Sequence, residues 1–154
     1  IKMGILDLFS KKEKNKVLTE ELIKLGLDKL NKEEAIKLAG ELLVEQGYIE
    51  EDYVEGMLIR EEKVTTYMGN GVAIPHGTNE SKQYIKQSGI SFLQFPDGID
   101  FGDGNTCYLL IGIAGKGDDH MEILQNLATV CQDEAATEEL ITTTDKKIII
   151  DQLV

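Results

Sequence analysis

The chain has 154 residues, of which 42% are hydrophobic and 29% are charged. This length suits one domain with a real hydrophobic core, and no apolar stretch approaches the roughly 20 residues that span a bilayer. Its 28 acidic and 16 basic residues give a formal net charge of −12, which argues against nucleic acid or an anionic membrane surface as a partner. Two cysteines make no disulfide framework, so a cytoplasmic location is expected.

The N-terminal segment differs in composition from the rest of the chain. Residues 1–16 begin with an apolar stretch and continue into a lysine-rich run. The run is followed by no small-residue cleavage site of the kind that ends a secretory signal peptide, and such charged runs are usually solvated. We therefore expect a flexible lead-in over residues 1–16 and one domain over residues 17–154.

Two helices are predicted after a short strand at residues 22–25. The first helix begins at Asn31, because a capping-box glutamate follows three residues later, and it ends at Gly47. The second begins at the acidic residues 50–52, since carboxylates suit the positive end of a helix dipole. Arg60 would lie near the C-terminus of this second helix, either as a surface residue paired with a glutamate or as a ligand for an anion.

Strand-like segments follow these helices. They are residues 65–68, 72–74, 89–95, 99–101 and 107–114. Pro96 is expected to end the third of them, because proline cannot donate to a strand ladder. The last is apolar on both faces, so we expect it in the middle of a sheet, with Cys107 in the core. Strands that alternate with helices indicate an α/β fold in which helices cover a sheet.

One histidine lies in a constrained string, GVAIPHGT at residues 71–78. Pro75 fixes its own φ near about −65° and keeps Ile74 extended. Gly77 has no side chain, so another molecule could approach the backbone closely. His76 would therefore be held at the end of a strand and open on one side. The same pattern also suits a turn histidine that has no chemical role.

The second histidine follows the apolar strand at residues 107–114. His120 is predicted in the first turn of a helix, beside backbone N–H groups that have no partner within the helix. Asp118 is a natural cap for that helix, and its spacing predicts that Met121 and Cys131 pack in the core. The last two segments of the chain are expected to be a short helix and a terminal helix or strand.

Three of these side chains could meet at one end of the sheet, where ligands of α/β proteins gather. A neutral histidine such as His76 is a competent nucleophile. The guanidinium of Arg60 binds phosphate oxygens with a forked pair of donors, and His120 at a helix start could donate a further hydrogen bond. These residue types suit phosphoryl transfer, which depends mainly on positioning and charge stabilisation.

A metal hydrolase is the alternative from a different class. Its site would join His76 and His120 to a carboxylate from Asp103, Asp118 or Asp119. The sequence has no tight ligand spacing such as HExxH, and the aspartates before His120 already suit helix capping. We therefore expect no metal and no other cofactor.

Two strings carry a resemblance to a known family. They are MLIRE at residues 57–61 and GVAIPHG at residues 71–77. Through them the chain resembles an enzyme IIA domain of the sugar phosphotransferase system, mannitol/fructose type, from about Leu22 to the C-terminus. Residues 46–53, 94–98 and 101–102 are most similar to the mannitol branch. The chain departs from that branch at Asn70, where an acidic residue often stands.

The resemblance implies a mixed β-sheet flanked by helices on both faces. It implies that His76 accepts a phosphoryl group from the phosphohistidine of the histidine-containing phosphocarrier protein. The group then passes to a cysteine of the enzyme IIB domain of the mannitol permease, so membrane contact would be indirect. His120 and Arg60 match the family's other active-site residues, which stabilise the phosphate charge. The alternative within the superfamily is a regulatory module for nitrogen or transcriptional control, also phosphorylated on His76.

Overall fold

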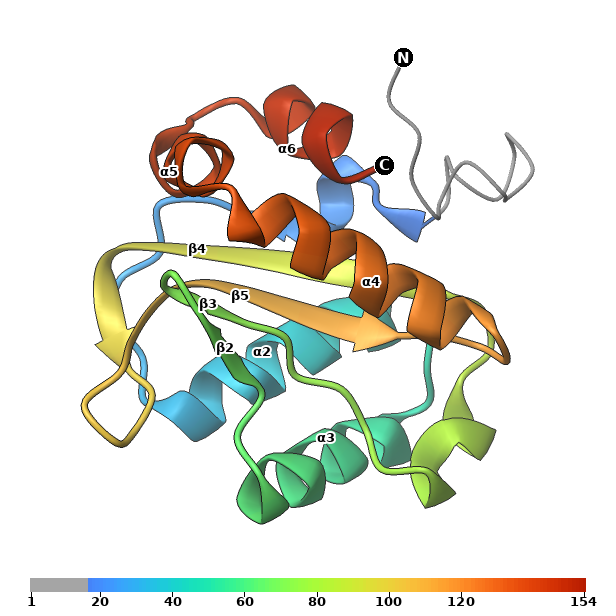
Figure 1. Ribbon diagram of the computed structural model, residues 1–154. Helices are drawn as coiled ribbons and strands as arrows, with labels where there is room; N and C mark the ends of the chain where they lie inside the picture. Colours follow the sequence, from blue (N-terminus) through green and yellow to red (C-terminus); the bar gives the residue numbers. More distant parts are fainter. Residues whose placement is uncertain (1–16) are drawn as a thin grey trace.

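The computed structural model describes residues 17–154 as one domain, with a sheet between two layers of helices (Figure 1). In chain order the elements are η2 (Glu20–Leu22), β1 (Ile23–Lys24), α2 (Lys32–Glu45), α3 (Glu51–Lys63), β2 (Tyr67–Gly69), β3 (Val72–Ala73), η3 (Glu80–Tyr84), β4 (Gly89–Asp100), β5 (Thr106–Ala114), α4 (Asp119–Gln132), α5 (Glu134–Thr142) and α6 (Lys146–Leu153). The labels η2 and η3 denote short 3-10 helices. The lead-in expected over residues 1–16 lies outside the described residues.

The five strands of the described residues form a mixed sheet in the order β1-β4-β5-β3-β2. β1 runs parallel to β4 and β3 parallel to β5, whereas the β4–β5 and β2–β3 pairs are antiparallel. Helices α2 and α3 lie on one face, and α4, α5 and α6 lie on the other (Figure 1). The mixed α/β sheet with helices on both faces is therefore confirmed, and β5 is its central strand as its apolar sequence predicted.

The start and end of α2 follow the local sequence signals. The side chain of Asn31 accepts a hydrogen bond from the Glu34 N–H at 2.8 Å, and Glu34 accepts one from the Asn31 N–H at 3.2 Å. This reciprocal pair satisfies two backbone donors that the helix leaves free, and a cap of this kind contributes about 1 kcal/mol. Gly47, with φ of +82°, follows the last turn, where a left-handed residue favours glycine.

The hydrophobic core lies on both faces of β4 and β5. Phe92, Leu110 and Ile111 are completely buried in these strands, as is Cys107. Cys131 lies on the buried face of α4, so both thiols pack as small apolar groups and the predicted core positions are confirmed. Burying a large aliphatic or aromatic side chain contributes roughly 1.5–3 kcal/mol, which makes this central pair of strands the rigid base of the domain.

The prediction that Pro96 ends a strand is wrong. β4 continues through this residue as a single strand from Gly89 to Asp100. Its pairing with β5 shifts register between Gln94 and Ile99, and Pro96 lies exposed in that irregular stretch. A bulge interrupts the ladder, so the missing N–H of proline costs no hydrogen bond there. The two strand segments predicted at residues 89–95 and 99–101 are therefore one strand.

Asn70 has a structural role in the turn between β2 and β3. Asn70 lies in the turn between β2 and β3 with φ of +53°, a conformation that asparagine tolerates better than most residues. Its side-chain N–H donates to the carbonyl oxygen of Cys131 at 2.9 Å, near the end of α4. A carboxylate has no proton to donate, so an aspartate or glutamate would lose this link between the turn and α4.

Candidate functional site

His76 lies on an extended segment that continues beyond β3 alongside the end of β5. It pairs with Ile113 as an isolated parallel bridge, and the Ile113 N–H donates to the Pro75 carbonyl at 2.8 Å. The space next to Gly77 is filled by the protein itself, because a Cβ there would lie 2.5 Å from Cε1 of Tyr53 and 2.3 Å from Oγ of Ser81. Glycine at this position is therefore required by close internal packing, and Gly77 also lines the pocket described below.

The imidazole of His76 is oriented by its own backbone. Its Nδ1 lies 2.8 Å from the carbonyl oxygen of Ile74. Because a carbonyl oxygen can only accept, Nδ1 carries the proton in this contact, and the lone pair of the neutral ring is on Nε2. Burial lowers the pKa of His76, and the positive charges of Arg60 and Lys82 lower it further. The ring is therefore kept neutral and nucleophilic near pH 7.

His120 lies in the first turn of α4, as predicted, and its ring faces that of His76. The two ring centroids are 5.2 Å apart, with the planes tilted by 60°. Within the described residues, the buried Nδ1 of His120 has no hydrogen-bond partner, which leaves Nε2 as the nitrogen that a ligand can meet. Burial lowers the pKa of His120 to about 4, and the neighbouring His76 and Lys82 contribute to this shift.

Among the described residues, the predicted capping hydrogen bond to the Asp118 side chain is not made, and the loop before His120 is held through Asp119 instead. Asp118 occupies the N-cap position of α4, but within residues 17–154 its side chain makes no capping hydrogen bond. Asp119 instead accepts a hydrogen bond from the Ser88 hydroxyl at 2.6 Å, and that hydroxyl accepts one from the Lys116 N–H at 2.9 Å. The loop between β5 and α4 is thereby fixed to the start of β4, which sets the position of His120.

Arg60 lies in the last turn of α3, and the pocket brings it together with both histidines. Its guanidinium donates to the Val64 carbonyl, and no contact with a glutamate is made within residues 17–154. A pocket of about 200 Å³ is lined by Arg60, Lys63, His76, Gly77, Thr78, Asn79, Glu80, Lys82 and His120. Three cationic side chains thus surround two neutral imidazoles in a protein of net charge −12. Such a pocket suits an anion.

No sequence pattern singled out the two lysines of this pocket, Lys63 and Lys82. Lys63 and Lys82 are exposed residues in charged or polar stretches, and many lysines of the chain share that description. Lys82 lies in η3 and lines the same pocket as His76. Burial is the main cause of the lowered pKa of both half-buried histidines, and the charge of Lys82 adds to it. Only the tertiary arrangement separates these lysines from the rest.

The structure gives the metal-hydrolase hypothesis no support. Asp103 lies in the turn between β4 and β5, and Asp119 is bound to Ser88. Asp103, Asp118 and Asp119 are absent from the residues that line the histidine pocket. In the part of the chain that the structure describes, no three His, Cys, Asp or Glu side chains gather where they could hold a metal ion.

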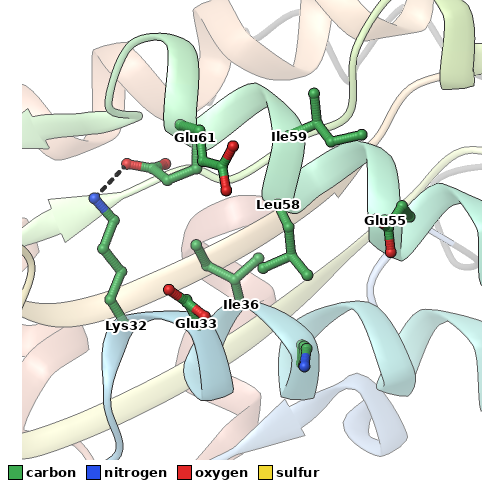
Figure 2. Close-up of a pocket in the computed structure, with 9 residues that line it drawn as sticks. Lys32, Glu33, Ile36, Glu55, Leu58, Ile59 and Glu61 are labelled. Atoms are coloured by element: carbon green, nitrogen blue, oxygen red, sulfur yellow. Dashed lines mark ion pairs between the residues drawn. The ribbon is translucent and has the colours of Figure 1, made fainter.

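A second pocket lies between α2 and α3 (Figure 2). It has a volume of about 280 Å³, with Ile36, Leu58 and Ile59 among its lining residues. At one end, Lys32 Nζ lies 2.9 Å from Oε2 of Glu61, as the dashed line shows. None of the three candidate site residues, His76, His120 and Arg60, lines this pocket, so it is not the candidate site.

Glu61 nevertheless fixes the turn that follows Arg60. Its carboxylate accepts hydrogen bonds from the backbone N–H and the hydroxyl of Thr66, in addition to the ion pair with Lys32. Burial alone would raise the pKa of Glu61, but hydrogen bonds from Thr65, Thr66 and Lys32 together hold it below its ordinary value. Because this buried carboxylate ties α3 to the start of β2, the last turn of α3 is held where Arg60 enters the pocket.

The lowered pKa of His120 predicts an acid-sensitive fold. Between about pH 6.5 and pH 4 the unfolded chain binds a proton on this residue that the folded chain does not, so the unfolding free energy falls as the pH drops. His120→Gln cannot take up that proton. We expect the variant to lose less stability than the wild type between pH 7.5 and pH 4.5, by roughly 1–2 kcal/mol after allowance for solvent screening of a half-buried ring.

Urea denaturation of both proteins at the two pH values measures this difference. The comparison at pH 7.5, where both side chains are neutral, gives the cost of the substitution itself. Equal losses of unfolding free energy in the wild type and His120→Gln would show that the ring of His120 is protonated as easily in the folded chain as in the unfolded one.

Comparison with known proteins identifies one family and relatives from that family. The family described as "Phosphoenolpyruvate-dependent sugar phosphotransferase system, EIIA 2" matches residues 16–154. The mannitol-specific phosphotransferase enzyme IIA component of Geobacillus stearothermophilus is 53% identical over 133 residues, which cover 81% of this chain and 92% of that protein.

Two solved structures have the same fold. The crystal structure of IIA mannitol from Escherichia coli matches with a TM-score of 0.82 and 40% identity, over 89% of this chain and 99% of that one. A complex of enzyme IIA mannitol and phosphorylated enzyme IIB mannitol from Escherichia coli contains a chain that matches with a TM-score of 0.83 and 39% identity, over 88% and 96% of the two chains. The protein therefore belongs to the EIIA 2 family of the phosphoenolpyruvate-dependent sugar phosphotransferase system.

Proposed function

We propose that this enzyme IIA protein carries a phosphoryl group on Nε2 of His76. The group comes from the phosphohistidine of the histidine-containing phosphocarrier protein and passes to a cysteine of the enzyme IIB domain of the mannitol permease. The observation that carries the proposal is the geometry of His76, a neutral ring whose Nδ1 is bound to the Ile74 carbonyl and whose ring lines a cationic pocket.

Each transfer exchanges one bond to phosphorus for another. The Nε2 lone pair of His76 attacks the phosphorus of the donor phosphohistidine, and the donor nitrogen leaves with the electron pair of the bond that breaks. As Nε2 becomes substituted, the ring gains positive charge, which the Nδ1–H contact with the Ile74 carbonyl stabilises. In the second step a cysteine thiolate of enzyme IIB attacks the same phosphorus, and His76 leaves as a neutral imidazole.

The cationic side chains of the pocket stabilise the negative charge that develops on the phosphate oxygens during transfer. Arg60 offers a forked set of donors, and Lys82 adds a point charge on the opposite chain segment. His120 remains neutral and donates one hydrogen bond through Nε2, since its Nδ1 is buried. These residues hold the phosphoryl group by charge and hydrogen bonds and form no covalent bond to it, so their loss slows transfer but leaves the phosphorylation site in place.

Exposed apolar side chains beside the pocket support docking of protein partners. Val64 is 65% exposed next to the turn of Arg60, and Met121 is 56% exposed next to His120. The prediction that Met121 packs in the core is wrong, because Ile123 and Leu127 occupy the buried face of α4. An apolar surface with lysines around it suits a partner that presents a phosphoryl group on an apolar face.

The mannitol relatives favour the transporter role over a regulatory module. The relative from Geobacillus is named mannitol-specific, and one matching chain comes from a complex with phosphorylated enzyme IIB mannitol. Among residues 17–154, no helix is long and apolar enough to cross a membrane, and the contact with the membrane that we propose runs through the permease. The free thiols of Cys107 and Cys131 fit work in the reducing cytoplasm.

The experiment that tests the proposal follows the phosphoryl group. The protein is incubated with labelled phosphoenolpyruvate, enzyme I and the phosphocarrier, and the acid-labile label is mapped before and after addition of a mannitol enzyme IIB domain. We expect the label on Nε2 of His76 and its complete passage to enzyme IIB. Label at another residue would contradict the site, and label on His76 that does not pass onward would identify a regulatory module.

A further inference from the structure

The buried hydroxyl of Tyr53 links the two segments that hold His76. Tyr53 lies in the first turn of α3, and its side chain is 1% exposed. Its hydroxyl donates to the Ile113 carbonyl at 2.8 Å and accepts from the Gly77 N–H at 2.9 Å. The side chain therefore joins the end of β5 to the residue that follows His76.

These bonds make the hydroxyl part of the ladder between His76 and β5. In a parallel bridge, a strand residue donates to the carbonyl before its partner and accepts from the N–H after it. Ile113 donates to the Pro75 carbonyl directly, at 2.8 Å. The other two groups, the Ile113 carbonyl and the Gly77 N–H, are the two that Tyr53 connects. The backbone is thus tied to β5 on both sides of His76.

The ring of Tyr53 is buried and packs closely against the segment that follows His76. A Cβ at Gly77 would lie 2.5 Å from Cε1 of this ring, so the loop and the ring are in close contact. Burial raises the pKa of Tyr53 to about 12, which keeps the hydroxyl protonated at any pH where the protein works. The hydroxyl is therefore a permanent donor to Ile113 and a permanent acceptor from Gly77.

We infer that Tyr53 is a positioning residue for phosphoryl transfer, which holds the His76 ring in the orientation that presents Nε2 to the pocket. This inference rests on the proposed function. Tyr53 itself touches neither the phosphoryl group nor the partner. Phosphoryl transfer depends on alignment of the attacking and leaving atoms, and a displacement of about 1 Å can slow such a step roughly a hundredfold.

The test compares Tyr53→Phe with a matched control. Tyr53→Phe keeps the ring and removes only the hydroxyl. Ser91→Ala removes a different buried hydroxyl, which links β4 to α2 by donating to the Ala39 carbonyl at 2.8 Å. Single-turnover transfer from the phosphocarrier is measured over a range of carrier concentrations. We expect Tyr53→Phe to lower the maximal transfer rate about 10- to 100-fold with an unchanged half-saturating concentration, and Ser91→Ala to change neither quantity.

A second measurement separates positioning from a general loss of packing. Nitrogen chemical shifts of the His76 ring report its tautomer, and Tyr53→Phe should lower the fraction that carries the proton on Nδ1, whereas Ser91→Ala should not. A wild-type transfer rate or a wild-type tautomer fraction in folded Tyr53→Phe would overturn the inference. Absence of label on His76 in the wild type would instead contradict the proposed function, on which this inference rests.

Amide exchange in the wild type tests the inference even if Tyr53→Phe does not fold. The Gly77 N–H should exchange as slowly as the amides of β5, because its acceptor is a buried hydroxyl. Exchange at the rate of a free amide would show that the bond to Tyr53 does not hold the segment, and would overturn the inference independently of any variant.

Discussion

His76→Gln is expected to abolish phosphoryl uptake from the phosphocarrier, with a loss of at least about a thousandfold in labelling rate. Glutamine is polar and close in size to histidine, but its amide nitrogen has no free lone pair that can attack phosphorus. The Nδ1 contact with the Ile74 carbonyl and the bridge to Ile113 show how firmly one imidazole is held at this position. The other ring of the pocket, His120, is proposed to donate a hydrogen bond through Nε2, which leaves its free lone pair on the buried Nδ1, where it cannot attack phosphorus.

The measurement is the rate at which label from phosphoenolpyruvate appears on the purified variant. His120→Gln is the matched control, since it removes an imidazole from the same pocket. That variant should still take label on His76 and should pass it on more slowly than the wild type, because His120 is proposed to stabilise charge and not to carry the group. Normal labelling of His76→Gln would disprove the central proposal.

Arg60→Gln is expected to slow transfer about 100- to 1000-fold in both steps, while the label still appears on His76. The guanidinium is the donor best suited to bind two phosphate oxygens at once, and its loss leaves the developing charge to the lysines of the pocket. Burial is the main reason that the pKa of His76 is lowered, and the charge of Arg60 adds to it. Removing that charge should therefore raise the pKa of His76.

The raised pKa of His76 should change how the transfer rate depends on pH. In Arg60→Gln the transfer rate should begin to fall at a higher pH on the acid side than in the wild type, since protonated His76 cannot attack. Lys37→Gln removes one positive charge outside the histidine pocket, from a lysine that lines the pocket between α2 and α3, and should leave the transfer rate and its pH profile unchanged. Arg60→Lys should restore the pH profile but only part of the rate, because lysine lacks the fork.

Stability must be measured beside these rates. The hydrogen bond from Arg60 to the Val64 carbonyl closes the last turn of α3, so its loss should cost about 0.5–1.5 kcal/mol of unfolding free energy. A well-folded Arg60→Gln with wild-type transfer in both directions would show that Arg60 has no role in binding the phosphoryl group.

Several features of the fold were determined by short stretches of sequence. The capping box of Asn31 and Glu34 and the glycine stop at Gly47 each act within one helical turn, and the structure has them where the sequence predicts. The apolar run of β5 predicts a central strand because both of its faces need cover. Pro75 restrains the backbone beside His76, and this local restraint marked the histidine as a candidate.

Other features depend on residues that are distant in the chain. The sequence could not place Pro96 inside β4, because the register shift that accommodates it is made by the partner strand β5. It placed Met121 in the core, since helical periodicity shows that a helix has an apolar face but not how far that face extends over the sheet. The lysine of η3 that enters the histidine pocket, Lys82, was indistinguishable from other surface lysines.

The sequence by itself therefore determined the class of fold and the local restraint on His76, and it named two histidines and one arginine as candidates for the site. The tertiary structure decided that these three side chains line one pocket. It also decided that Nδ1 of His76 is hydrogen-bonded to the Ile74 carbonyl and that the Tyr53 hydroxyl completes the ladder beside His76. The physical reason is range. Backbone propensities and caps act over a few neighbouring residues, whereas hydrogen-bond partners, burial and pKa shifts depend on which distant segments the folded chain brings together.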